Sequence, residues 1–146
     1  MKVVLCHGTF DLLHIGHVAL FAFAKSLGDH LIVSVTADAF VHKGPGRPVF
    51  NEDERAMMIK SVRYVDEVHI CRERSGIAMI ALHRPAIYVK GEDYATSDKH
   101  GLLGVERRAV ESYGGKVVIA DGLPMSSSTS LIERVSKWKE AQHAFS

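Results

Sequence analysis

The sequence predicts a single α/β domain, spanning residues 1–146, in which helices flank a five-stranded parallel sheet. Two observations carry this prediction. Short runs rich in Val and Ile alternate along the chain with amphipathic stretches, which is the pattern of parallel sheets with right-handed crossovers. The most apolar of these runs, such as "KVVLC" and "HLIVSV", indicate strands that are buried on both faces of the sheet.

The elements follow one another without an internal repeat or a low-complexity segment. We expect strands at residues 2–6, 30–35, 66–70, 86–90 and 116–120. We expect helices at residues 17–28, 51–62, 75–83, 104–115 and 126–141. In such folds, ligands bind at the carboxyl ends of the strands, where a loop meets the N-terminus of a helix.

Signals at the ends of the elements support these boundaries. The first helix ends at Gly28, a candidate C-cap. The second begins at Asn51, a candidate N-cap, and Glu54 follows three residues later as in a capping box. Segment 37–50 contains two Gly and two Pro residues. We therefore expect it to be a loop that closes over a ligand.

The composition excludes several classes of protein. Lys and Arg number 18 and Asp and Glu 17, so the net charge of +1 argues against a nucleic-acid-binding protein. No apolar run approaches the roughly 20 residues of a membrane span, and the N-terminus does not resemble a signal peptide. Two cysteines, Cys6 and Cys71, cannot build a disulfide framework. We expect free thiols and a cytoplasmic location.

The stretch "CHGTFDLLHIGH", residues 6–17, combines a strand end, a turn and a helix start. Unpaired N–H groups and the helix dipole at such a place favour an anion. A zinc site made of Cys6, His7, His14 and His17 is disfavoured, because their spacing matches no structural zinc pattern. A Cys6 nucleophile is disfavoured too, because a thiol in an apolar strand stays protonated. G-x-G-x-x-G and Walker A motifs are absent.

"GTFDLLHIGH" resembles the signature of the cytidylyltransferase-like nucleotidyltransferases, in which H-x-G-H follows a G-x-F-D turn. The resemblance extends along the chain, through "HKGPGRPVF", "VKGEDY" and "SSSTSLI". It implies a Rossmann-like fold and an enzyme that joins a nucleoside triphosphate to a phosphorylated small molecule, releasing pyrophosphate. It also implies Mg²⁺ bound through the phosphates rather than in a protein cage, and a homodimer, with neither nucleic acid nor membrane as a partner.

The resemblance also assigns roles to residues. His14, His17 and Lys43 would be catalytic, as donors to phosphate oxygens. Each has an ordinary alternative: satisfied histidines at a helix start, and a solvated loop lysine. Nucleotide and phosphate contacts would come from Gly8, Thr9, Phe10, Gly16, Lys90, Gly91, Asp93, Ser127, Ser128 and Thr129, with Tyr94 as an alternative to Asp93. Acceptor-binding or orienting residues would be Asp11, Arg47 and Arg55, for which the alternatives are a turn-former at Asp11 and a surface helix pair at Arg55.

The substrates are less defined than the reaction. One branch of the family uses CTP with glycerol phosphate, phosphoethanolamine or phosphocholine, and another uses ATP with a heptose phosphate. We expect transfer of CMP to a phosphorylated alcohol or sugar such as glycerol 3-phosphate. The alternative is adenylyl transfer to a heptose or other sugar phosphate, and Gly122 favours it, because many CTP enzymes carry arginine there. Ile132, where other branches place arginine, argues against phosphopantetheine and nicotinate mononucleotide. A non-catalytic nucleotide-binding module is the remaining reading.

Overall fold

The structure is a computed structural model that describes residues 1–91, 101–124 and 127–143. Within these residues, five parallel strands form one sheet in the order β3-β2-β1-β4-β5. The strands are β1 (Val3–Gly8), β2 (His30–Thr36), β3 (Glu67–Cys71), β4 (Ile87–Gly91) and β5 (Lys116–Ala120). The predicted sheet is confirmed. The chain order reverses between β1 and β4, and such a switch point is where α/β sheets bind ligands.

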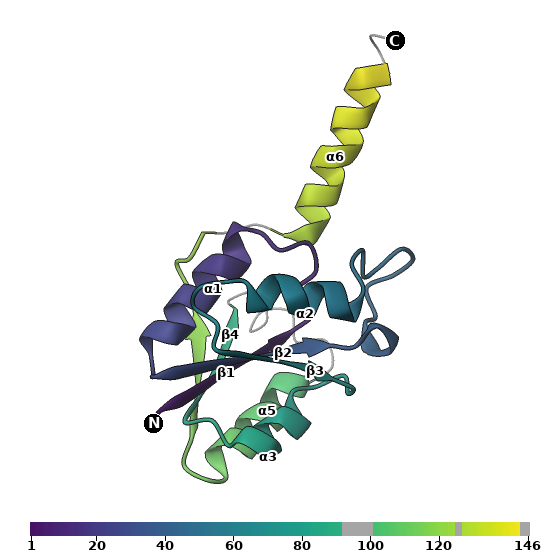
Figure 1. The fold of residues 1–146 in the computed structure, drawn as a ribbon. Coiled ribbons are helices and arrows are strands. Elements are labelled where there is room, and N and C mark those ends of the chain that lie inside the picture. Colours follow the sequence, from purple (N-terminus) through teal and green to yellow (C-terminus); the bar gives the residue numbers. More distant parts are fainter. Residues whose placement is uncertain (92–100, 125–126, 144–146) are drawn as a thin grey trace.

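Helices cover both faces of the sheet, as Figure 1 shows. α1 (Ile15–Ser26) and α2 (Glu52–Lys60) lie on one face, whereas α3 (Ile77–His83) and α5 (Leu102–Glu111) lie on the other. The last helix, α6 (Ser128–His143), projects away from the body (Figure 1). Each of these helices overlaps a predicted one. The 37–50 segment forms a loop, as expected, with a short 3-10 turn, Asp38–Phe40, near its start.

The core has two layers because successive residues of a strand point to opposite faces. On β1, Val4 and Cys6 join the apolar cluster under α1 and α2. Leu5 points the other way, into a cluster with Ile80 of α3 and Val110 of α5. The central strands are therefore buried on both faces, as their apolar sequences predict.

Capping confirms one predicted boundary and corrects another. At the start of α2, Asn51 Oδ1 accepts from Glu54 N at 2.9 Å and Glu54 Oε1 accepts from Asn51 N at 3.1 Å, which is the predicted capping box. Gly28, in contrast, is not a left-handed C-cap: the cap is Leu27, in the right-handed region. Gly28 is small for another reason, since a Cβ there would lie 2.7 Å from the carbonyl oxygen of Lys2.

A buried carboxylate ties α5 to the sheet and to α3. Glu106 is fully buried, and its Oε2 accepts from Tyr88 Oη at 2.6 Å and from Gly76 N at 2.8 Å. Position 76 accommodates only glycine, because a Cβ there would lie 2.7 Å from Tyr88 Oη. The start of α3 is thus held against β4. No described helix combines the length and apolarity that crossing a membrane requires.

Candidate active site

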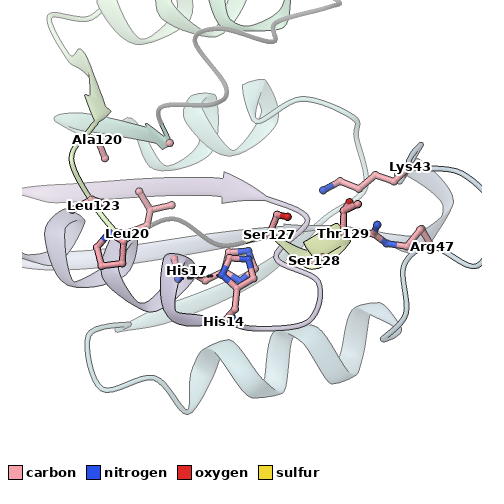
Figure 2. Close-up of a pocket in the computed structure, with 13 residues that line it drawn as sticks. His14, His17, Leu20, Lys43, Arg47, Ala120, Leu123, Ser127, Ser128 and Thr129 are labelled. Carbon is pink, nitrogen blue, oxygen red and sulfur yellow. Dashed lines mark hydrogen bonds between the residues drawn. The ribbon is translucent and has the colours of Figure 1, made fainter. Parts of the chain in front are cut away.

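A pocket of about 510 Å³ opens where β4 and β5 end and the N-termini of α1 and α6 converge (Figure 2). The positive ends of both helix dipoles face this region, which suits an anion. The loop after the 3-10 turn Asp38–Phe40 contributes two basic side chains, Lys43 and Arg47. The lining residues are His14, Gly16, His17, Leu20, Lys43, Arg47, Gly91, Ala120, Leu123, Pro124, Ser127, Ser128 and Thr129.

The two predicted catalytic histidines lie together at the start of α1, with stacked rings whose centroids are 3.7 Å apart. Both also cap that helix. His14 Nδ1 accepts from Gly16 N at 3.1 Å, and His17 Nδ1 accepts from His14 N at 3.3 Å. A ring nitrogen that accepts a hydrogen bond carries no proton, so each neutral ring carries its proton on Nε2. The caps therefore fix both imidazoles as Nε2–H donors.

The electrostatic environment keeps these rings neutral. Burial and the neighbouring Lys43 lower the pKa of His14. Burial, followed by His14 and Lys43, lowers the pKa of His17 to about 3, although Asp11 opposes the shift. Neutral imidazoles keep both roles at physiological pH, because a second proton on Nδ1 would remove the acceptor that caps the helix.

This lowered pKa predicts that the protein loses stability in acid. Unfolded His17 binds a proton below about pH 6.5, whereas folded His17 does so only near pH 3, so the unfolded state binds more protons between these values. The free energy of unfolding should therefore be largest above about pH 6.5 and fall as the pH drops. Urea unfolding at about pH 7.5 and about pH 5 measures this. A shallower fall is expected for His17→Asn, and equal free energies at the two pH values would contradict the prediction.

Two small residues make room for this arrangement. A Cβ on Gly16 would lie 2.9 Å from Cε1 of His14, so glycine is required for that ring to cap the helix. A Cβ on Gly8 would lie 3.0 Å from Cζ of Phe10. Phe10 adopts a positive φ of 51° and packs edge-on against His17, with ring centroids 5.5 Å apart. Phe10 thus supports His17 from the core, Gly8 leaves room for the Phe10 ring, and neither residue lines the pocket.

Asp11 connects three segments around the pocket without lining it. Its buried carboxylate accepts from the backbone N–H groups of Val49 and Phe50 in the loop, and lies 3.5 Å from Nε of Arg47. Its carbonyl oxygen accepts from Oγ of Ser128 at the start of α6. Of its two predicted roles, this geometry favours ordering the loops over contacting the acceptor.

The three hydroxyl residues at the start of α6, Ser127, Ser128 and Thr129, have different roles. Ser127 Oγ accepts from Ser130 N at 3.0 Å, which is an ordinary N-cap. Ser128 is buried and donates to the carbonyl of Asp11, so it anchors the helix to the β1 loop. Thr129 is exposed and lines the pocket (Figure 2). One hydroxyl caps, one anchors and one faces the site.

The loop supplies the cations of the pocket. Lys43 and Arg47 both line it, and Figure 2 shows them on the side opposite Leu123 and Leu20. Arg47 is largely buried and lies beside Asp11, whereas Lys43 is exposed. The site thus combines two imidazole donors, two basic side chains and two helix N-termini, a set suited to a polyphosphate.

Comparison with known proteins identifies the family. Residues 5–135 match the cytidylyltransferase-like family. The chain belongs to this family. Its domain is therefore a nucleotidyltransferase domain, as "GTFDLLHIGH" predicts.

Individual relatives agree with this assignment. The bifunctional protein HldE of Koribacter versatilis is 41% identical over 135 residues, which cover 91% of this chain and 27% of that protein. The HldE of Gluconobacter oxydans is 43% identical over 133 residues, covering 90% of this chain and 27% of that protein. The chain thus spans about a quarter of the length of these curated relatives.

Solved structures of other proteins share the fold. The lipopolysaccharide core biosynthesis protein from Thermoplasma volcanium superimposes with a TM-score of 0.70 at 25% identity, covering 87% of this chain and 99% of that one. Pantothenate synthetase from Thermus thermophilus superimposes with a TM-score of 0.57 at 18% identity, covering 82% of this chain and 55% of that one, and shows likeness of fold alone.

Two basic residues that the family resemblance assigns to ligands lie away from this pocket. The side chain of Arg55 is fully buried and donates to Thr9 O, Phe50 O and Asp38 Oδ1. It is thus neither a surface partner nor a lining residue, and the geometry favours an orienting role. Lys90 is buried as well, and its Nζ donates to the carbonyl of His7 at 2.8 Å. Of the "VKGEDY" segment, Gly91 lines the pocket, and Asp93 and Tyr94 lie outside the described residues.

The geometry supports neither of the two alternatives for residues 6–17, a zinc site and a Cys6 nucleophile. Cys6 is fully buried, and burial raises the pKa of its thiol to about 12. His7 is not among the pocket-lining residues, and a hydrogen bond of 2.7 Å joins its Nδ1 to Ser34 Oγ. In the part of the chain that the structure describes, no three His, Cys, Asp or Glu side chains are grouped to hold a metal ion.

Some lining residues carry no chemical signal in the sequence. Leu20, Ala120, Leu123 and Pro124 form the apolar wall of the pocket. The position of Ala120 at the end of β5 is the feature that could have indicated it, because parallel strands end at a common edge. Such a wall suits the flat face of a nucleobase or a sugar better than a phosphate.

Loss of the Lys43 side chain should reduce turnover without destabilising the fold. Lys43 is exposed on the loop, so Lys43→Ala removes a cation from the phosphates and leaves the core intact. We expect kcat to fall by about tenfold or more with an unchanged melting temperature. His42→Ala, an exposed neighbour on the same loop, is the matched control. An unchanged rate would make Lys43 a solvated loop residue.

Proposed function

We propose that this nucleotidyltransferase transfers AMP from ATP to the phosphate of a heptose or another sugar phosphate. An oxygen of the acceptor phosphate attacks the α-phosphorus of ATP in line. The bond between the α-phosphorus and the α–β bridging oxygen breaks, and pyrophosphate leaves with the electron pair. No covalent intermediate on the protein is needed, so positioning and charge stabilisation are the tasks of the site.

The observation that carries this proposal is the similarity to HldE proteins over about nine-tenths of the chain. Of the two branches that the sequence resembles, the ATP-using heptose-phosphate branch is the one that these relatives favour. The Thermoplasma volcanium protein that shares the fold is a lipopolysaccharide core biosynthesis protein, which agrees with a sugar phosphate as the acceptor. Gly122, in place of the arginine of many CTP enzymes, agrees. The expected transfer of CMP to glycerol 3-phosphate is therefore the less supported reading.

Each polar group of the pocket has a task in this reaction. The Nε2–H groups of His14 and His17 donate to triphosphate oxygens, where negative charge moves as the α–β bond breaks. The N-terminus of α6 and the hydroxyl of Thr129 hold the phosphates that become pyrophosphate. Lys43 completes the cradle from the loop. Because the imidazoles are already neutral and oriented, they need no reorganisation during the reaction.

Magnesium fits this site only as an ion carried by the nucleotide. The described residues offer no group of three suitable ligands, and the carboxylate of Asp11 is occupied by backbone N–H groups. The triphosphate would therefore supply most ligands, and the ion would neutralise phosphate charge. We expect excess chelator to stop pyrophosphate release and added Mg²⁺ to restore it. Full activity in excess chelator would contradict this role.

A screen for pyrophosphate release tests the substrates. ATP, CTP, GTP and UTP are each combined with heptose phosphates, glycerol 3-phosphate, phosphoethanolamine and phosphocholine. We expect release with ATP and a heptose or related sugar phosphate. Release with CTP and glycerol 3-phosphate would overturn the proposal in favour of the cytidylyl reading. Nucleotide binding without release for any pair would favour a non-catalytic module.

A further inference from the structure

Arg47 is a basic residue of the pocket to which the proposed reaction assigns no role. Its side chain is only 12% exposed, and its Nε is buried without a hydrogen-bond partner among the described residues. An unpaired buried donor is costly, because it has lost its hydrogen bonds to water and gained none in return. A donor in this state at the wall of a pocket suits a ligand that supplies the missing acceptor.

Asp11 holds Arg47 in place without using its donors. Arg47 Nε lies 3.5 Å from Asp11 Oδ2, which is within reach of an ion pair but longer than a hydrogen bond of this kind. The carboxylate already has other partners. Its Oδ1 accepts from the backbone N–H groups of Leu12 and Phe50, each at 3.0 Å, and its Oδ2 accepts from that of Val49. The charge of Asp11 therefore attracts the guanidinium, while the N–H groups of the guanidinium stay available to a ligand.

Asp11 also places Arg47 at the end of the pocket that α6 forms. The backbone carbonyl of Asp11 accepts from Oγ of Ser128, in the first turn of that helix. Arg47 and Ser128 thus contact the same residue. Figure 2 shows the nitrogen atoms of Arg47 on the side that faces Thr129, which follows Ser128 and lines the pocket. The guanidinium therefore lies where the proposed reaction holds the phosphates that leave.

We propose that Arg47 binds the β- and γ-phosphates of the nucleotide and the pyrophosphate that they form, and not the acceptor phosphate. In-line displacement places the acceptor and the pyrophosphate on opposite sides of the α-phosphorus, so a residue at the α6 end faces the leaving group. A guanidinium donates two parallel hydrogen bonds to a phosphate. Its positive charge balances the negative charge that pyrophosphate gains with the electron pair of the broken bond.

The reverse reaction needs the same contact. In that direction an oxygen of pyrophosphate attacks the α-phosphorus of the nucleotide-linked product, and the acceptor phosphate leaves with the electron pair. Arg47 then binds pyrophosphate as a substrate. The inference rests on the proposed function for the position of the leaving group. It does not depend on the base or the acceptor, because every such transfer releases pyrophosphate.

Binding of inorganic pyrophosphate to the 146-residue chain tests the contact directly. With Mg²⁺ present, isothermal titration calorimetry should show that Arg47→Ala weakens this binding by at least about tenfold. Arg47→Lys should recover only part of the loss, because an ammonium lacks the planar fork. Arg72→Ala is the matched control: Arg72 is 70% exposed, pairs with Glu52 at 3.0 Å and does not line the pocket, so pyrophosphate affinity should not change. Equal affinities of Arg47→Ala and the wild type would overturn the proposal.

A comparison of nucleotides separates phosphate binding from anchoring of the loop. AMP lacks the β- and γ-phosphates, so Arg47→Ala should bind ATP at least about tenfold more weakly and AMP as tightly as the wild type does. Equal losses for ATP and AMP would overturn the proposal, because Arg47 would then only hold the loop. In steady-state assays, the KM for ATP should rise and that for the acceptor should not; the opposite result would return Arg47 to the acceptor. If the substrate screen selects CTP, CTP and CMP replace ATP and AMP, and the pyrophosphate measurement stands unchanged.

Discussion

Replacement of His17 by alanine is expected to lower kcat by about 10²- to 10³-fold. The reason is that the Nε2–H of His17 is a fixed neutral donor, held by the hydrogen bond that its Nδ1 accepts from His14 N at 3.3 Å. Such a preoriented donor stabilises charge in the transition state without reorganisation. We expect His14→Ala to behave similarly. Steady-state pyrophosphate release with the substrates identified by the screen gives kcat.

The structure also allows the donor role of His14 to be separated from its capping role. His14→Asn keeps a side-chain oxygen that can accept from Gly16 N, so the helix cap is retained while the Nε2–H donor is lost. We expect His14→Asn to keep the melting temperature of the wild type and still lose turnover as His14→Ala does. If His14→Asn retained near-normal kcat, the histidine would act only as a cap, and the assignment of a phosphate donor would fail.

The elements of the fold were predictable because their signals are local. Asn51 and Glu54 lie three residues apart, so the capping box that starts α2 can be recognised without the rest of the chain. The apolar runs of β1 and β4 similarly predict strands buried on both faces. Gly28 shows the limit of such local signals. A glycine after a helix suggests a left-handed C-cap, but here a side chain is excluded because the carbonyl oxygen of Lys2, distant in sequence, lies too close.

The sequence predicts which residues form the site better than it predicts what each of them does. His14, His17, Lys43 and Thr129 meet in one pocket, as the motifs suggest. Ser128 belongs to the same hydroxyl-rich turn, yet it donates to the carbonyl of a residue 117 positions away. No local pattern can assign that partner. The tautomers of the histidines were also open in the sequence, because they depend on which backbone N–H each ring meets.

Arg55 shows how a positional signal can be overlooked. It lies four residues before Ile59, so the two share a face of α2, and Ile59 is fully buried. The helical period therefore indicates that Arg55 is buried on the same face of α2 as Ile59. Its charge, in contrast, suggests a position on the surface or facing a ligand. The role of Arg55 follows from its partners. Thr9 lies on the turn that carries Asp11. Phe50, the second partner, also donates a backbone hydrogen bond to the carboxylate of Asp11.

Arg55→Ala should be among the most destabilising single substitutions in the chain. The guanidinium is fully buried and donates to Phe50 O at 2.9 Å, Thr9 O at 2.8 Å and Asp38 Oδ1 at 2.7 Å. Truncation leaves two carbonyl groups and a carboxylate without this partner, so we expect the free energy of unfolding to fall by about 3 kcal/mol or more. Urea unfolding measures the change.

A matched surface arginine sets the scale for this loss. Arg107, 43% exposed, lies 3.8 Å from Glu111 on α5, and Arg107→Ala should cost less than about 1 kcal/mol because exposed pairs contribute little. Arg55→Lys should lie closer to Arg55→Ala than to the wild type, since one ammonium cannot reach three acceptors in the fixed fork of a guanidinium. If Arg55→Ala cost no more than Arg107→Ala, the loops around the pocket would be held by Asp11 alone, and Arg55 would lose its role in orienting the site.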